Sequence, residues 1–429
     1  MENSVKNLIQ FIDHSPSCFH VIENAKKQFL EHGFIQLEEK EHWNLEEGKS
    51  YFVERNGSSM IAFHLPKKDF QGFHIVASHS DSPTYRIKEQ PEMSVEKHYT
   101  KLNIERYGGM IPETWFDRPL SVAGRIIIEE NGQIKDQLVN VDRDLMIIPN
   151  LAIHMSRSSN ESKQLNPQKD LLPLCGGNLT KDGFEEMIAK ESGVEKEDIL
   201  SYDLFLYNRM RGTTLGINEE FVAAPKLDDL ECAYSSIEGM LNAKLSKDYV
   251  TVCAVFDNEE VGSGTKQGAG STFFPEVLKR ISYLCGKNEE EYYMAVADSF
   301  MLSADNAHAV HPNYQDKTDP TNRPYINEGI VLKYNASQKY TTDSNSAALV
   351  KYLCKKEKIK CQVFFNRSDM LGGSTLGNIL TGQVSIKAAD IGLPQLSMHS
   401  TYETAGCKDL DDMITLMESF YELGKEVQI

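Results

Sequence analysis

Three carboxylates follow a strongly apolar segment near the middle of the chain. Residues 250–256 form a nearly continuous run of β-branched and apolar side chains, which is typical of a strand buried on both faces of a sheet. Asp257, Glu259 and Glu260 come directly after it. Carboxylates at the end of a buried strand are costly unless a cation compensates them. The segment therefore predicts one half of a metal site.

A histidine occupies the same kind of position earlier in the chain. His79 follows a strand expected over residues 73–77, and Asp81 comes shortly after it. A histidine at a strand end is more often a hydrogen-bonded structural residue than a ligand. Asp81 favours the ligand role, because ligating imidazoles usually donate their second N–H to a carboxylate or a carbonyl.

Two adjacent aspartates begin a helix that we expect over residues 227–243. Acidic side chains at a helix start commonly cap the helix or stabilise its first turn. We prefer that interpretation for Asp229. For Asp228, capping and metal binding are equally well supported by the residues themselves.

The remaining candidates lie in the C-terminal part of the chain. Asp305, His308 and His311 follow a strand expected over residues 292–298, and their spacing does not choose among them. His399 lies in a short loop before the last expected helix. Taken alone, a loop histidine is a weak indication of function.

As a set, these histidines and carboxylates form a mixed nitrogen and oxygen donor group. Such a group suits Zn²⁺, Mn²⁺ or Co²⁺ better than Ca²⁺, which prefers oxygen ligands only. The adjacent glutamates also suggest a division of work. One can bind a metal ion while the other stays free to accept a proton from an attacking water.

The elements that must position these residues alternate between strand and helix after residue 225. This pattern favours an α/β fold with a mostly parallel central sheet flanked by helices, in which catalytic groups gather at the carboxyl ends of the strands. Residues 86–224 instead show short strand-like pieces between turn signals, which indicates a β-rich insertion. We therefore expect one domain from residues 1–85 and 225–429, and a second from residues 86–224.

Composition excludes several classes of partner. The net charge of −18 argues against nucleic acid and anionic membranes. No apolar run approaches the roughly 20 residues of a membrane span, and the N-terminal residues do not form a signal peptide. The eight cysteines are scattered without a CxxC pair, which indicates a reducing, cytoplasmic location.

With these residues in place, the chain resembles the aspartyl aminopeptidase family of dinuclear zinc metallopeptidases along essentially its whole length. The resemblance rests on the ordered motifs SPSCFH, SHSDSP, RYGG, TWFDRPL, IPNLAIH, KLDDLE, DNEEVGS, SADNAHAVHPNY, LKYNASQKY, SDMLGGSTLG and SMHS. No position that would bind metal or act in catalysis departs from the family pattern.

The resemblance implies a role for each candidate in a zinc-exopeptidase type of fold with two Zn²⁺ per subunit, for which Mn²⁺ or Co²⁺ could substitute. One ion would be bound by His79 and Asp305, the other by Glu260 and His399, and Asp228 would bridge both. Glu259 would be the general base. Two further assignments follow: Asp81 would orient His79, and His308 and His311 would be structural.

The resemblance also implies a substrate and an assembly. The substrate would be a peptide with a free N-terminal Asp or Glu, contacted by Lys333, Tyr340 and Gly373. The β-rich insertion would be an oligomerisation domain in a tetrahedral homo-dodecamer built from dimers. His154 would reach into a neighbouring subunit's active site, although it also fits a structural histidine at a strand end.

Three alternatives differ in substrate or in class. The enzyme could prefer neutral or hydrophobic N-terminal residues, in which case Lys333 would be a solvated lysine at a strand end. A deacylase or carboxypeptidase on the same fold would accept a blocked N-terminus. An inactive shell protein would keep the assembly without hydrolysis, which the intact set of candidate ligands disfavours.

Overall fold

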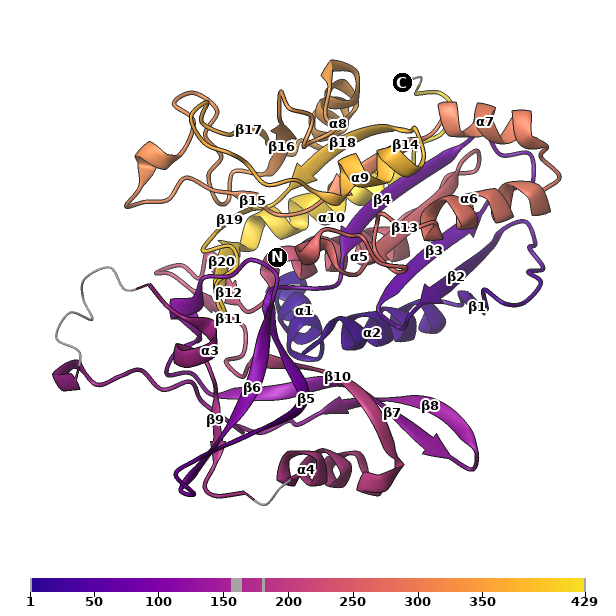
Figure 1. The fold of residues 1–429 in the computed structure, drawn as a ribbon. Coiled ribbons are helices and arrows are strands. Elements are labelled where there is room, and N and C mark those ends of the chain that lie inside the picture. Colours follow the sequence, from indigo (N-terminus) through magenta and orange to yellow (C-terminus); the bar gives the residue numbers. More distant parts are fainter. Residues whose placement is uncertain (1, 156–163, 180–181, 428–429) are drawn as a thin grey trace.

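The computed structural model describes residues 2–155, 164–179 and 182–427, and Figure 1 shows their arrangement. The largest element is a mixed, mostly parallel sheet of nine strands. In spatial order its strands are β1 (Ile35–Leu37), β2 (Lys49–Arg55), β3 (Ser59–Leu65), β13 (Val250–Phe256), β4 (Phe73–His79), β14 (Phe300–Ala304), β18 (Lys387–Gly392), β16 (Ile330–Tyr334) and β17 (Cys361–Phe365).

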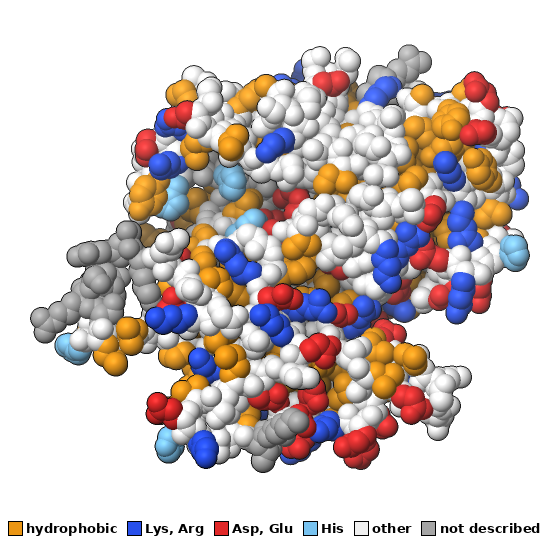
Figure 2. Space-filling model, viewed as in Figure 1, with side chains coloured by type: hydrophobic (Ala, Val, Ile, Leu, Met, Phe, Trp, Pro, Cys, Tyr) orange, Lys and Arg blue, Asp and Glu red, His pale blue; other side chains and the backbone are white. Residues whose placement is uncertain are grey.

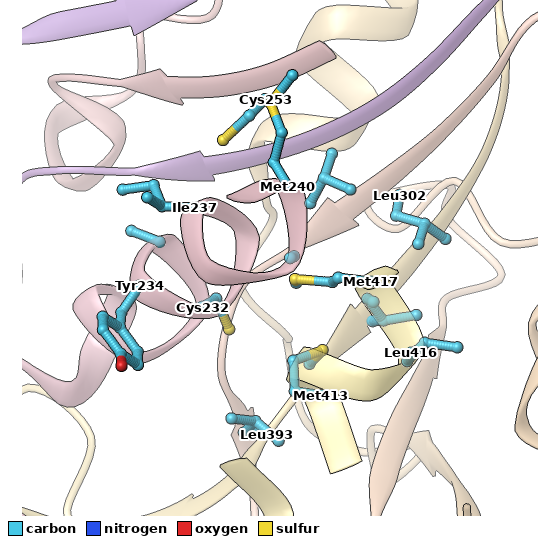
Figure 3. Packing of buried hydrophobic residues seen from close by; sticks show 14 of the residues in the cluster. Cys232, Tyr234, Ile237, Met240, Cys253, Leu302, Leu393, Met413, Leu416 and Met417 are labelled. Carbon is cyan, nitrogen blue, oxygen red and sulfur yellow. The ribbon is translucent and has the colours of Figure 1, made fainter. Parts of the chain in front are cut away.

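Helices pack on both faces of this sheet, each face with its own apolar core. One face is covered by α1 (Glu2–Asp13), α2 (Cys18–Glu31), α5 (Leu227–Asn242), α8 (Ser344–Glu357) and α10 (Cys407–Tyr421). The other is covered by α6 (Phe273–Leu284), α7 (Glu289–Ala297) and α9 (Leu376–Gln383). Figure 3 shows part of the first core, with Met240 of α5 and Met417 of α10 among its buried side chains. The expected fold class, a mostly parallel sheet between helices, is confirmed.

A second sheet of six antiparallel strands takes all its strands from residues 84–208. In spatial order these are β8 (Gln133–Asn140), β7 (Leu120–Glu130), β10 (Ile199–Asn208), β5 (Thr84–Val95), β6 (Tyr99–Tyr107) and β9 (Leu174–Gly176), with the helices α3 (Pro167–Asp170) and α4 (Gly183–Ser192) beside them. Its core is separate from those of the larger sheet. The domain boundaries at residues 86 and 224 stay a prediction.

A small third sheet joins the two larger parts. Its strands are β11 (Thr213–Leu215), β12 (Phe221–Ala224), β20 (Glu403–Gly406), β19 (Pro394–Leu396) and β15 (Ala307–His308). It brings the segment before α5 beside the segment after His399, which are far apart in the sequence. Among the described residues, no helix is long and apolar enough to cross a bilayer.

The prediction of a strand over residues 292–298 is wrong. These residues belong to the helix α7, which a capping box between Asn288 and Glu291 begins. The two adjacent tyrosines suggested a strand, but the acidic first turn and the cap favour the helix. The strand that leads to Asp305 is β14, which starts at Phe300.

The end of β18 shows why a glycine is required beside Asp305. A Cβ on Gly392 would lie 2.1 Å from the backbone oxygen of Asp305. The amide of Asp305 donates to the carbonyl of Ile391 at 3.1 Å, which holds the two segments together. Gly392 therefore lets the backbone that carries Asp305 pack directly on β18.

We expect Gly392→Ala to lower the free energy of unfolding by about 1–3 kcal/mol, because the added methyl overpacks this contact. The measurement is the midpoint of urea denaturation. Gly382→Ala is the matched control, since a Cβ there meets nothing within 4 Å and alanine is the better helix former in α9. Equal midpoints for the two variants would contradict the prediction.

Candidate metal centre

The candidate residues meet at one edge of the nine-stranded sheet. The strands β4, β13 and β14 are parallel neighbours, so their carboxyl ends lie side by side. His79 is the last residue of β4, Glu259 and Glu260 form a 3₁₀ turn just after β13, and Asp305 follows β14 directly. Asp228, at the start of α5, reaches the same edge.

Two groups of potential ligands share one aspartate. Ligand atoms of His79, Asp228, Asp229 and Asp305 lie within 4.8 Å of one another, and so do those of Asp228, Glu260 and His399. A third group joins His79, Glu259 and Glu260. The structure thus brings together the five expected ligands and the expected base, while their individual roles stay predictions.

The carboxylate of Asp228 faces both groups. Its Oδ1 lies 3.5 Å from Nε2 of His79, and its Oδ2 lies 3.3 Å from Nε2 of His399. The same His399 nitrogen is 3.3 Å from Oε1 of Glu260. This is the position that a residue shared between two cations would need.

The unsatisfied polar atoms of the cluster indicate that it suits a metal ion. Three buried carboxylate oxygens, Oδ1 of Asp228, Oδ1 of Asp229 and Oε1 of Glu260, find no hydrogen-bond donor among the described residues. An unsatisfied buried carboxylate oxygen is costly, whereas a cation would compensate all three. Imidazole nitrogens and carboxylate oxygens are donors that Zn²⁺ accepts.

Asp81 holds the two halves of the cluster together. Nδ1 of His79 lies 3.1 Å from the Asp81 carbonyl oxygen and 3.3 Å from its Oδ1. The Asp81 carboxylate also accepts the backbone N–H groups of Glu259 at 3.1 Å and Glu260 at 3.2 Å. Asp81 is therefore placed to orient His79, and it also fixes the turn that carries both glutamates.

The six-stranded sheet contributes to the same place. The hydroxyl of Tyr107, at the end of β6, donates to Oδ2 of Asp81 at 2.7 Å and accepts from Nδ2 of Asn258 at 2.8 Å. Gly108 follows with φ +78°, and a Cβ there would lie 3.1 Å from Cβ of Glu260. Sequence reasoning assigned no role to Tyr107 or Gly108, although both lie in the RYGG motif.

Asp229 differs from its expected role at a helix start. Its backbone is not helical, and its Oδ2 accepts the N–H of His79 at 3.0 Å instead of capping α5. It is completely buried. The side chain therefore belongs to the cluster, and only its adjacency to Asp228 could have indicated this.

The glutamates and histidines of the cluster have strongly shifted pKa values. Burial raises the pKa of Glu259 well above its usual range, with His79 opposing, and raises that of Glu260 to about 7, with His399 opposing. Burial by itself lowers the histidine pKa values, but neighbouring carboxylates raise that of His399 to about 11 and that of His79 well above normal. A metal ion must displace these protons to bind.

We expect zinc to stabilise the chain more strongly as the pH rises. The folded-state pKa of Glu260 lies above its ordinary value of 4.5, so the ion-free chain loses stability between that value and about 7 as the carboxyl ionises. The raised histidine pKa values also make metal binding release protons. The difference in melting temperature between zinc-loaded and chelator-treated protein should grow from about pH 5.5 to about pH 7.5. A constant difference would contradict the expectation.

Two of the expected substrate residues lie next to the cluster. Lys333 is 2% exposed, and its Nζ donates to the backbone oxygens of Asp305 at 2.6 Å and Asn306 at 3.2 Å. The same Nζ lies 5.3 Å from the ring centroid of Tyr340. The ammonium group thus lies beside the cluster and also supports the segment that carries Asp305.

The other expected residues lie in different surroundings. His154 is exposed, in a 3₁₀ turn on a segment that extends away from both large sheets (Figure 1). Gly373 lies between β17 and α9, and a Cβ added there would meet nothing within 4 Å. The rings of His308 and His311 pack against Phe364 and Tyr314, in keeping with a structural role.

The surface in Figure 2 is hollowed where histidine and acidic side chains gather together. A sheet between two helical layers, with a buried cluster of histidines and carboxylates at its strand ends, is an arrangement suited to a metal-dependent hydrolase.

Comparison with known proteins identifies the family. The family model described as "Aminopeptidase I zinc metalloprotease (M18)" matches residues 11–421. A "Probable M18 family aminopeptidase 2" of Clostridium acetobutylicum is 46% identical, over 97% of this chain and 98% of its own. A protein of the same description from Pseudomonas aeruginosa is 37% identical, over 97% of both chains.

Solved structures of similar proteins support the same family. The cryo-EM structure of the Ape4 and Nbr1 complex superposes with a TM-score of 0.95 at 36% identity, covering 98% of this chain and 85% of that chain. The S. cerevisiae mApe1 dodecamer gives 0.86 at 27% identity, covering 98% and 97%. The chain belongs to the M18 aminopeptidase family of zinc metalloproteases.

Proposed function

We propose that this M18 aminopeptidase binds two zinc ions per chain and removes single acidic residues from the N-termini of peptides. The observation that carries the proposal is the Asp228 carboxylate, whose two oxygens face His79 and His399 in two separate groups of ligands. His79 and Asp305 would complete one metal position, and Glu260 and His399 the other. Mn²⁺ or Co²⁺ could replace zinc, because the donor set suits all three.

The bound ions would lower the pKa of a water molecule and polarise the scissile carbonyl. The chain's own contribution is proton transfer by Glu259, which would take a proton from the attacking water and pass it to the leaving amine. Two features support this role. Its backbone is fixed by Asp81, and burial raises its pKa well above that of a free carboxylate, which makes it a better base.

We expect Glu259→Gln to lower kcat about a thousand-fold, because the amide keeps the shape of the side chain but cannot accept the proton. Metal content, measured by elemental analysis, should stay at the wild-type value. Glu260→Gln is the matched control on the neighbouring residue, and it should lose metal instead. Near wild-type turnover of fully loaded Glu259→Gln would show that another group is the base.

The preference for Asp or Glu is supported by Lys333. A buried ammonium beside the cluster would attract a substrate carboxylate, and Tyr340 lies next to it. A lysine acts as a point charge, so it should favour acidic over neutral residues without sharply separating Asp from Glu. Gly373 would lie near the same pocket.

A panel of aminoacyl amides tests the preference. Lys333→Ala should reduce the ratio of kcat/KM for Asp over Leu by about 10- to 100-fold, the value of a hydrogen bond to a charged group. The ratio is the informative quantity, because Lys333 also supports Asp305 and its loss will slow every substrate. Lys360→Ala, which removes a surface ammonium paired with Glu328, is the control and should leave the ratio unchanged. A wild-type preference for Leu would favour the neutral-residue alternative.

We also propose a homo-dodecamer built from dimers, the assembly size of the similar S. cerevisiae mApe1 dodecamer. The segment around His154 supports this proposal, because Leu151, Ile153 and Met155 expose 50%, 46% and 75% of their surface. Exposed apolar side chains in one segment mark an interaction surface. His154 would then reach a neighbouring subunit's active site. The cytoplasmic location stays a prediction.

A further inference from the structure

Glu403 occupies a buried position between two segments of the candidate metal centre. It is the first residue of β20, and its Cα pairs with that of Ala224 in the antiparallel strand β12. The chain leaves β12 there and turns into α5, which carries Asp228. Glu403 also lies shortly after His399 in the sequence. Its side chain is 1% exposed.

Both carboxylate oxygens of Glu403 accept backbone N–H groups of candidate ligands. Oε2 accepts from Asp228 at 3.0 Å, and Oε1 accepts from His399 at 2.6 Å. Asp228 and His399 are two of the three residues in the group that Glu260 completes. One buried side chain therefore fixes the separation of two segments that converge on the same metal position.

The backbone of His399 needs this support. Its φ of +66° lies in the left-handed region, which is strained for residues other than glycine. Such a conformation persists only when the surroundings hold it. The N–H of His399 is held by Glu403, and its carbonyl accepts the N–H of Ile111 at 3.0 Å.

We propose that Glu403 is a positioning residue that sets the affinity of one metal position, the one formed by Asp228, Glu260 and His399. This inference rests on the proposed metal centre and goes beyond its ligands. A carboxylate is required because it alone presents two acceptor oxygens to two amides. Glutamine keeps the shape, but its amide nitrogen would face one of the N–H groups without accepting it.

The chain offers a matched control for a merely structural role. Asp409 is completely buried and also accepts two backbone N–H groups, from Asn327 at 2.6 Å and Gly329 at 2.7 Å. Neither of those residues belongs to the candidate cluster. Asp409→Asn therefore disrupts the same kind of contact, one carboxylate accepting two backbone N–H groups, at a place where neither N–H belongs to a candidate ligand.

The experiment is a calorimetric titration of chelator-stripped, full-length protein with Zn²⁺, for the wild type, Glu403→Gln and Asp409→Asn. Glu403→Gln should bind one ion about 10- to 100-fold more weakly and the other with a clearly smaller loss, because the second position shares Asp228 but not His399 with the first. Asp409→Asn should lower the melting temperature of the stripped protein and leave both affinities unchanged.

Unchanged affinities in Glu403→Gln, equal losses at both positions, or the same loss in Asp409→Asn would each overturn the proposal. If Glu403→Gln does not fold, Glu403→Asp decides. Its side chain is one methylene shorter and cannot reach both amides, so it should weaken one position at least about tenfold, and wild-type affinities would overturn the proposal. A wild type that binds fewer than two ions would instead refute the proposed metal centre itself.

Discussion

The crowding of carboxylates in a buried space is the constraint on which the rest of the structure depends. Asp228, Asp229, Glu260 and Asp305 come together where water is largely excluded, and like charges at such distances repel strongly. Neighbouring histidines lie within 3.5 Å of Asp228, but three carboxylate oxygens of the cluster still have no hydrogen-bond donor among the described residues, so the charge is only partly compensated. Asp81 and Glu403 hold the backbones of several of these groups in place.

Polar contacts from distant parts of the chain hold the backbone of the cluster in place. Asp81 accepts the amides of Glu259 and Glu260, and Glu403 accepts those of Asp228 and His399. Tyr107 of the six-stranded sheet donates to Asp81. The second sheet is thus part of the environment of the cluster, whatever its role in assembly.

Sequence reasoning found the groups whose position follows from a strand end. His79 and Glu260 come just after apolar runs, and parallel strands bring such residues to one edge, so their convergence could be predicted. It failed where local signals competed. Tyr292 and Tyr293 suggested a strand, but the capping box at Asn288 begins a helix there. The strand β18 went unrecognised, because its sequence, KAADIG, consists mostly of residues that are uncommon in strands and shows no clear strand pattern.

The sequence by itself determined the fold class, the family and the set of residues that could bind metal or transfer protons. Hydrophobic periodicity and ordered motifs are local features, so they can be recognised in the sequence without the fold. Only the tertiary structure decided which carboxylates share a site and which hold it. Asp229 and Glu403 carry no distinguishing local pattern, and their roles arise from amides of His79, Asp228 and His399 that approach them in space. Hydrogen bonds between segments far apart in the chain depend on the folded arrangement, which the order of residues does not display.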